Sequence, residues 1–151
     1  MNDSESGQHI HTKLQQIWGY SDFRLPQREI IRSILSGQDT LIIMPTGGGK
    51  SICFQLPALL QTGLTIVVSP LVALMENQVK ELRDRHLPAA LLHSELPKDS
   101  RFKTLQQLEQ QQLKLLYLSP ETLLSKPIWE RLSQPQLKID TLILDEAHCL
   151  S

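Results

Sequence analysis

The chain alternates between short continuous apolar runs and longer segments in which apolar residues recur every three or four positions. The continuous runs are expected to form β-strands at 40–44, 64–69, 89–93, 113–119 and 139–145. Apolar runs without polar alternation are typical of strands that are covered on both faces, as in parallel sheets. The pattern therefore predicts a parallel sheet with helices on both sides.

The segments between these runs have helical periodicity. In 71–86, the apolar residues Leu71, Met75, Val79 and Leu82 lie three or four positions apart, which places them on one face of a helix. Further helices are expected at 50–61, 99–112 and 126–134, with two more before the first strand, at 11–20 and 26–37. This alternation of strand and helix predicts an α/β fold, a doubly wound parallel sheet with right-handed crossovers.

Composition sets the outer limits on function. The 151 residues are 40% hydrophobic, which suffices for the core of one ordinary domain. The apolar runs are too short to span a bilayer, and the polar start of the chain does not resemble a secretory signal, so a cytoplasmic protein without a membrane partner is expected. The net charge of −1 argues against binding nucleic acid through bulk electrostatics, but it does not exclude a local groove.

The two cysteines give no sign of a disulfide or a zinc site. Cys53 and Cys149 are far apart in the sequence, and each lies in an apolar or motif context. Such a pattern fits reduced, buried thiols better than a bridge or a metal knuckle.

The first predicted strand leads directly into a glycine-rich segment, Pro45-Thr46-Gly47-Gly48-Gly49, and then into a helix near Lys50. Three consecutive glycines let backbone N–H groups approach phosphate oxygens, and the helix N-terminus adds a positive dipole. Lys50 would reach the β and γ phosphates of ATP, and the Ser51 hydroxyl would bind Mg²⁺. Met44 stands where the common pattern has glycine, but the later glycines supply the curvature. A plain glycine turn is the alternative, and the Lys-Ser pair favours a nucleotide site.

A second motif ends the last predicted strand, at Asp145-Glu146. The first carboxylate is suited to holding Mg²⁺, and the second to orienting or deprotonating an attacking water. Alone, two carboxylates after a strand are commonly a solvated strand end. Together with the glycine loop, they indicate an ATP-hydrolysing P-loop fold.

These motifs resemble those of a known family. Asp145-Glu146-Ala147-His148 is similar to the box of superfamily 2 helicases, and the longer string DEAHCLS resembles the RecQ family of DNA helicases. Further resemblances to RecQ motifs lie in GYSDFRLPQ (19–27), MPTGGGKS (44–51), SPLVALMENQV (69–79) and YLSPETL (117–123). The resemblance covers essentially the whole chain. Two departures are small: Leu25-Pro26 stand where Pro-Gly is commoner, and Thr122 stands where an arginine is usual.

The resemblance implies a role for each motif residue. The catalytic set is Lys50, Asp145, Glu146 and His148. The ATP-binding set is Tyr20, Arg24, Gln27, Thr46, Gly47, Gly48, Gly49, Lys50 and Ser51, and the Mg²⁺ ligands are Ser51 and Asp145. The chemistry of the adenine motif agrees, because an amide such as that of Gln27 can pair with both a donor and an acceptor of the base, on which Tyr20 and Arg24 can stack.

The DNA contacts implied by the resemblance are Ser69, Pro70, Ser119 and Pro120. Each Ser-Pro pair follows a predicted strand and is expected to open a helix, with serine as N-cap and proline at the first helical position. That is ordinary helix chemistry. The resemblance adds that these helix N-termini offer N–H donors to phosphates of a single DNA strand.

By the resemblance, residues 1–36 form an N-terminal helical segment with the adenine motif, and 37–151 form a partial RecA-like motor lobe that stops after the DEAH box. The implied function is ATP- and Mg²⁺-dependent unwinding of duplex DNA with 3′-to-5′ translocation, in repair and recombination. The implied DNA partners are single-stranded and partly duplex DNA. The second lobe, which carries the arginine finger, is absent from this chain, and a bacterial protein would be associated with the nucleoid. The family fold also implies a later strand between 40–44 and 139–145, so unpaired backbone groups are expected there. An RNA helicase of superfamily 2 and a non-catalytic nucleotide- or partner-binding fragment are the alternatives.

Overall fold

A computed structural model describes residues 12–19, 31, 40–44 and 51–145. Its centre is a five-stranded sheet in the order β1-β5-β2-β4-β3, in which every neighbouring pair is parallel. The strands are β1 (Thr40–Met44), β2 (Leu64–Val68), β3 (Ala89–Leu92), β4 (Leu115–Leu118) and β5 (Ile139–Asp145). The predicted parallel sheet is confirmed, and each strand lies within two residues of its expected bounds.

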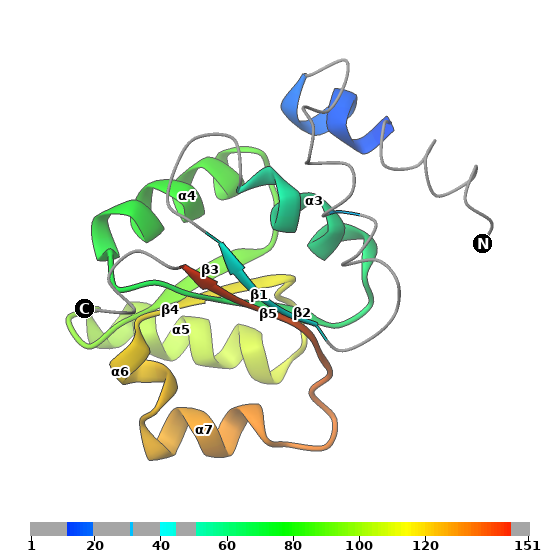
Figure 1. The fold of residues 1–151 in the computed structure, drawn as a ribbon. Coiled ribbons are helices and arrows are strands. Elements are labelled where there is room, and N and C mark those ends of the chain that lie inside the picture. Colours follow the sequence, from blue (N-terminus) through cyan, green and yellow to red (C-terminus); the bar gives the residue numbers. More distant parts are fainter. Residues whose placement is uncertain (1–11, 20–30, 32–39, 45–50, 146–151) are drawn as a thin grey trace.

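Helices cover both faces of this sheet (Figure 1). The α3 and α4 helices lie on one face, and α5, α6 and α7 lie on the other. Their bounds are α3 (Ile52–Leu60), α4 (Val72–Asp84), α5 (Lys98–Glu109), α6 (Pro120–Leu123) and α7 (Lys126–Leu132), and a short π-helix, η1 (Leu14–Trp18), precedes them. The α/β doubly wound class predicted from the sequence is therefore confirmed.

Most strand residues are apolar because helices cover both faces of the sheet. Along β4, Tyr117 belongs to the hydrophobic cluster under α3 and α4, whereas its neighbours Leu116 and Leu118 belong to the cluster under α5 and α7. Burying one such leucine side chain contributes about 1.5–3 kcal/mol relative to leaving it exposed. Two separate layers of core thus flank one sheet.

The β1 and β5 strands are direct neighbours, contrary to expectation. They pair in parallel from Thr40 opposite Thr141 to Met44 opposite Asp145. The expected unpaired backbone groups between these two strands are therefore absent from this structure. Both segments are apolar and run in the same direction, so they satisfy each other's N–H and C=O groups.

Both of the helices expected before the first strand are only partly described. The segment expected at 11–20 contains η1. Gly19 follows this helix with a φ of 75°, and its N–H donates to the Gln15 carbonyl at 3.1 Å. Of the helix expected at 26–37, the structure describes Ile31, which is buried. The remainder lies outside the described residues.

Hydrogen bonds hold the loop after α3 against the start of β5 and against the residue that precedes β4. The Gly63 N–H donates to Asp140 Oδ2 at 2.7 Å, and Lys114 Nζ donates to the Gln61 carbonyl. A Cβ at Gly63 would lie 2.7 Å from both Asp140 Oδ2 and the Lys138 carbonyl oxygen, so this close approach requires glycine. The carboxyl end of α3 is held against the sheet at this point.

Candidate nucleotide site at the carboxyl edge of the sheet

All five strands run the same way, so their carboxyl ends lie along one edge, where open α/β sheets bind their ligands. Met44 ends β1, Asp145 ends β5, and these two residues are register partners. The glycine-rich segment 45–50 starts directly after Met44, and Glu146 directly follows Asp145. The two motifs expected to bind nucleotide therefore leave the sheet at adjacent positions.

The α3 helix receives the chain after the glycine-rich segment. Ser51 already has helical backbone angles, with φ −60° and ψ −34°, and its carbonyl accepts from the N–H groups of Phe54 and Gln55 at 3.2 and 3.0 Å. Every residue from 52 to 58 is buried. The strand–loop–helix context required of a phosphate loop is thus confirmed on both sides of the loop.

The structure places part of the predicted site. Among the predicted residues, Ser51, Ser69, Pro70, Ser119 and Pro120 are described, and Asp145 is placed by its backbone. The others, Tyr20, Arg24, Gln27, Thr46, Gly47, Gly48, Gly49, Lys50, Glu146 and His148, lie outside the described residues, as does Cys149. Cys53 is buried and forms no disulfide within the described residues, in agreement with the prediction for this cysteine.

Ser69 follows β2 but does not cap a helix. Its hydroxyl accepts from the Leu71 N–H at 3.1 Å, and Leu71 has φ −97° and ψ 88°, which is not helical. The α4 helix begins at Val72, so Pro70 precedes it and is not its first residue. The expected N-cap at Ser69 is therefore wrong, because the serine closes a local turn one step earlier.

Ser119 does cap a helix, as predicted. Its hydroxyl accepts from the Thr122 N–H at 3.4 Å, and Pro120 is the first residue of α6. The hydroxyls of Ser119 and Thr122 also share a hydrogen bond of 2.7 Å, and both side chains are buried. The threonine that replaces the family's usual arginine thus completes the cap.

The two Ser-Pro turns lie side by side at the carboxyl edge. They follow β2 and β4, which are neighbours, and the Ser69 N–H donates to the Leu118 carbonyl at 3.1 Å. Both serines are buried, and both hydroxyls take part in local hydrogen bonds. A ligand at this edge would therefore meet backbone groups and the prolines before it met the serine hydroxyls.

A buried polar cluster, which sequence reasoning missed, joins three elements behind this edge. Gln55 Nε2 on α3 donates to the Tyr117 hydroxyl oxygen on β4 at 2.9 Å, and that hydroxyl donates to Gln78 Oε1 on α4 at 2.8 Å. Tyr117 is only 1% exposed. The available signal was Gln78, a polar residue within the apolar periodicity of its helix. The cluster ties the helix after the phosphate loop to the two elements that carry the Ser-Pro turns.

Removing the Tyr117 hydroxyl is expected to destabilise the protein and to change its response to alkali. Burial raises the pKa of Tyr117 well above its ordinary value, more than the hydrogen bond from Gln55 lowers it. The unfolded chain therefore loses this proton near pH 10 while the folded chain keeps it. The stability contribution is full below about pH 10, and it falls by about 1.4 kcal/mol per pH unit above that point.

The measurement is the free energy of unfolding in urea for the unmodified protein and Tyr117→Phe, between about pH 8 and about pH 11. Below pH 10 the variant should be less stable by about 1–3 kcal/mol, because buried Gln55 and half-buried Gln78 each lose a partner. That difference should shrink at the alkaline end. A difference that stays constant with pH would contradict the buried, protonated hydroxyl. Tyr20 is present in both proteins, so its ionisation cancels.

Comparison with known proteins identifies the family. Residues 24–151 match the model of the DEAD/DEAH box helicase family. The chain belongs to this family. The Asp145-Glu146-Ala147-His148 motif, whose first residue is the register partner of Met44, lies within the matched range.

Individual relatives confirm the resemblance to RecQ proteins. The chain is 63% identical to an ATP-dependent DNA helicase RecQ of Synechocystis over 143 residues, which cover 95% of this chain and 30% of that protein. It is 45% identical to a probable ATP-dependent DNA helicase RecS of Bacillus subtilis, over 93% of this chain and 28% of the relative. For an ATP-dependent DNA helicase Q-like 5 of Arabidopsis thaliana the identity is 38%, over 97% of this chain and 16% of the relative. The chain spans less than a third of the length of these relatives.

The described residues add two negative findings. None of their helices is long and apolar enough to cross a membrane. No group of three or more histidine, cysteine, aspartate or glutamate side chains within this part of the chain could hold a metal ion.

Proposed function

We propose that the protein carrying this chain is an ATP-dependent DNA helicase of the RecQ type, and that residues 1–151 hold its ATP-binding part. The observation that carries the proposal is the register of β1 and β5. This register sets Met44, after which the glycine-rich segment begins, opposite Asp145, the first residue of the acidic pair. Family membership and relatives named as DNA helicases support the same function.

The proposed ATP chemistry divides among residues from both motifs. Backbone N–H groups of Gly47 to Gly49 and the Lys50 ammonium hold the phosphates, with Thr46 in the same loop. The Ser51 hydroxyl and the Asp145 carboxylate are the oxygen ligands that suit Mg²⁺, which would neutralise phosphate charge when bound. The fit is supported by their positions, since Ser51 starts α3 and Asp145 ends the strand beside β1. Glu146 deprotonates the attacking water, and His148 completes the box.

The proposed DNA path runs over the adjacent turns at Ser69-Pro70 and Ser119-Pro120. Because the hydroxyls and N–H groups of both serines already have local partners, we assign the phosphate contacts to backbone N–H groups at the starts of α4 and α6. Such contacts would hold a single strand without reading its sequence. Translocation is proposed to run from 3′ to 5′ on that strand, in the service of DNA repair and recombination. We assign the protein to the cytoplasm, where it would act on nucleoid DNA in a bacterial cell.

The function is tested with the full-length gene product on short duplexes that carry either a 3′ or a 5′ single-stranded tail. ATP-dependent separation of the 3′-tailed DNA duplex is expected, and Lys50→Ala should abolish it, because the phosphates lose their cation. Lys80→Ala, at an exposed site on α4, is the matched control and should leave unwinding unchanged. Separation of RNA duplexes alone would instead favour the RNA helicase alternative, and binding without any unwinding would favour a non-catalytic protein.

Gln27 is expected to make the enzyme prefer ATP over GTP. If its amide pairs with the adenine edge, Gln27→Ala should weaken ATP use by about 1–3 kcal/mol, the typical cost of leaving a buried polar edge unpaired. The measurement is kcat/KM for ATP and GTP hydrolysis in the full-length protein. Gln16→Ala, at an exposed position of η1, is the control. Equal turnover of ATP and GTP by the unmodified protein would remove Gln27, and with it Tyr20 and Arg24, from base recognition.

A further inference from the structure

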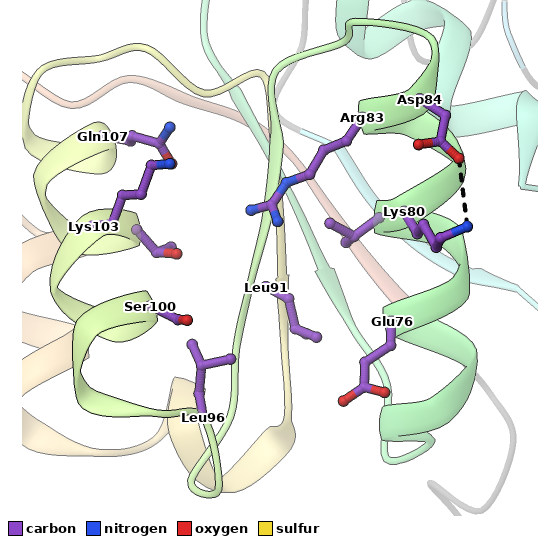
Figure 2. A pocket seen from close by; sticks show the side chains of 11 residues that line it. Glu76, Lys80, Arg83, Asp84, Leu91, Leu96, Ser100, Lys103 and Gln107 are labelled. Atoms are coloured by element: carbon purple, nitrogen blue, oxygen red, sulfur yellow. Dashed lines mark ion pairs between the residues drawn. The ribbon is translucent and has the colours of Figure 1, made fainter.

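The outer edge of the sheet carries a groove that is separate from the proposed nucleotide site. It has a volume of about 550 Å³ and lies between α4 and α5, with Leu91 of β3 in its lining (Figure 2). The β3 strand is at the end of the sheet opposite β1. Nothing in the proposed ATP or DNA chemistry uses this edge.

The backbone of β3 alternates between its partner strand and the groove. In a parallel pair, the N–H and C=O groups of alternate residues face the neighbouring strand. The β3–β4 register and the hydrogen bond from the Ser119 N–H to the Leu92 carbonyl turn Ala90 and Leu92 toward β4. Ala89 and Leu91 therefore face outward.

Of the two outward-facing residues of β3, Leu91 is the one whose backbone groups have no hydrogen-bond partner within the described ranges. Ala89 is already satisfied, because its carbonyl accepts from Arg83 Nε at 2.9 Å and its N–H donates to the Leu87 carbonyl at 3.0 Å. Beyond β3, the His93 carbonyl accepts from the Leu96 N–H at 3.2 Å. Within the described ranges, the outward N–H and C=O of Leu91 have no such partner, so one donor and one acceptor face the groove.

Positive charge enters the groove from both of its walls. Figure 2 shows the Arg83 guanidinium reaching from α4 into the space between the helices, with Lys103 on the facing wall. Lys80 is paired with Asp84 at 3.7 Å and points away. Neither Arg83 nor Lys103 has an acidic partner among the residues the structure describes. The Nε bond to β3 holds Arg83 in place and leaves its terminal nitrogens free to bind an anion.

We propose that this groove binds a short, extended, acidic segment of a partner protein. The segment would add to β3 through the N–H and C=O of Leu91, and an aspartate or glutamate of the segment would reach Arg83 and Lys103. Addition of a peptide strand to an open sheet edge is a common recognition mode, with backbone bonds supplying affinity and side-chain sites supplying specificity. Because β3 has only four residues, few backbone bonds can form and the affinity should be modest.

The groove chemistry favours a peptide over a nucleic acid. A peptide backbone supplies both the acceptor and the donor that Leu91 requires, whereas a phosphate backbone supplies acceptors alone. Leu91 and Leu96 add an apolar surface on which an aliphatic side chain can pack.

The test uses the full-length protein and a fluorescein-labelled peptide in which valine and glutamate alternate, followed by fluorescence anisotropy. Saturable binding is expected, with a loss of about tenfold in Lys103→Glu, because one charge-assisted contact becomes a repulsion. Lys98→Glu makes the same charge change at an exposed position of the same helix, outside the groove lining, and should bind as the unmodified protein does. ATP hydrolysis should be equal in all three proteins.

Two further probes separate the parts of the proposal. Glutamine in place of glutamate in the peptide should weaken binding and remove its sensitivity to Lys103→Glu. Amide hydrogen exchange at Leu91 should slow when the glutamate peptide is bound, because its N–H gains a partner. Absence of saturable binding, equal losses in Lys98→Glu and Lys103→Glu, or unchanged exchange at Leu91 would overturn the proposal. Displacement of the peptide by a single-stranded oligonucleotide, with the same dependence on Lys103, would show a nucleic-acid site instead.

Discussion

Glu146→Gln in the full-length protein is expected to slow ATP hydrolysis by a factor of about 10² to 10⁴ while ATP and Mg²⁺ still bind. Glutamine keeps the shape of the side chain and leaves the Asp145 carboxylate in place, but it cannot accept a proton from the attacking water. The measurement is phosphate release under saturating single-stranded DNA, with nucleotide affinity determined separately by a fluorescent ATP analogue.

Glu121→Gln supplies the matched control. It makes the same chemical change on α6, where the glutamate is exposed, and should leave both hydrolysis and affinity unchanged. Hydrolysis by Glu146→Gln near the unmodified rate would exclude Glu146 as the base. A parallel loss of nucleotide binding would instead move Glu146 into the binding set.

A polypeptide limited to residues 1–151 is expected to show no DNA-stimulated ATP hydrolysis and no strand separation. By the family resemblance, the second motor lobe supplies the arginine finger, and such a residue is worth a factor of about 10³ to 10⁵ in phosphoryl transfer. Opening and closing of two lobes on DNA would also be absent. Weak binding of ATP and Mg²⁺ is still expected, because the phosphate loop and both carboxylates lie within these residues.

The assay is phosphate release by residues 1–151 with and without single-stranded DNA, beside the full-length protein at equal concentration. Lys50→Ala in both forms identifies turnover that depends on the phosphate loop. DNA-stimulated turnover by residues 1–151 that Lys50→Ala abolishes would show that these residues already form a complete motor.

The strands were predictable from sequence because burial on both faces leaves continuous apolar runs. The run at 113–119, for example, contains β4, in which all four residues are buried. Sequence does not give the spatial order of strands, so the direct pairing of β1 with β5 was not foreseen. The local structure at the two Ser-Pro pairs was also not fully predictable from the sequence. The same dipeptide caps α6 at Ser119 and closes a turn at Ser69, and the backbone of Leu71 makes the difference.

The candidate site, too, was only partly predictable from the sequence. A nucleotide site could be predicted because a glycine-rich segment with Lys50 and an acidic pair at a strand end are each short, contiguous motifs. The cluster of Gln55, Tyr117 and Gln78 could not, since its hydrogen bonds join residues 62 and 39 positions apart. The groove at β3 depends on which backbone groups a neighbouring strand leaves open, and this information exists only after the sheet is assembled.

The way α3 is fastened has a mechanical consequence. Its carboxyl end is held to the sheet through Gly63 and Asp140, its middle is bonded to Tyr117 through Gln55, and most of its length is buried. A helix that is held at several points along its length is expected to keep its position on the sheet when a ligand binds near Ser51. Any movement that accompanies ligand binding would then occur in parts of the protein other than α3 and the sheet to which it is bonded.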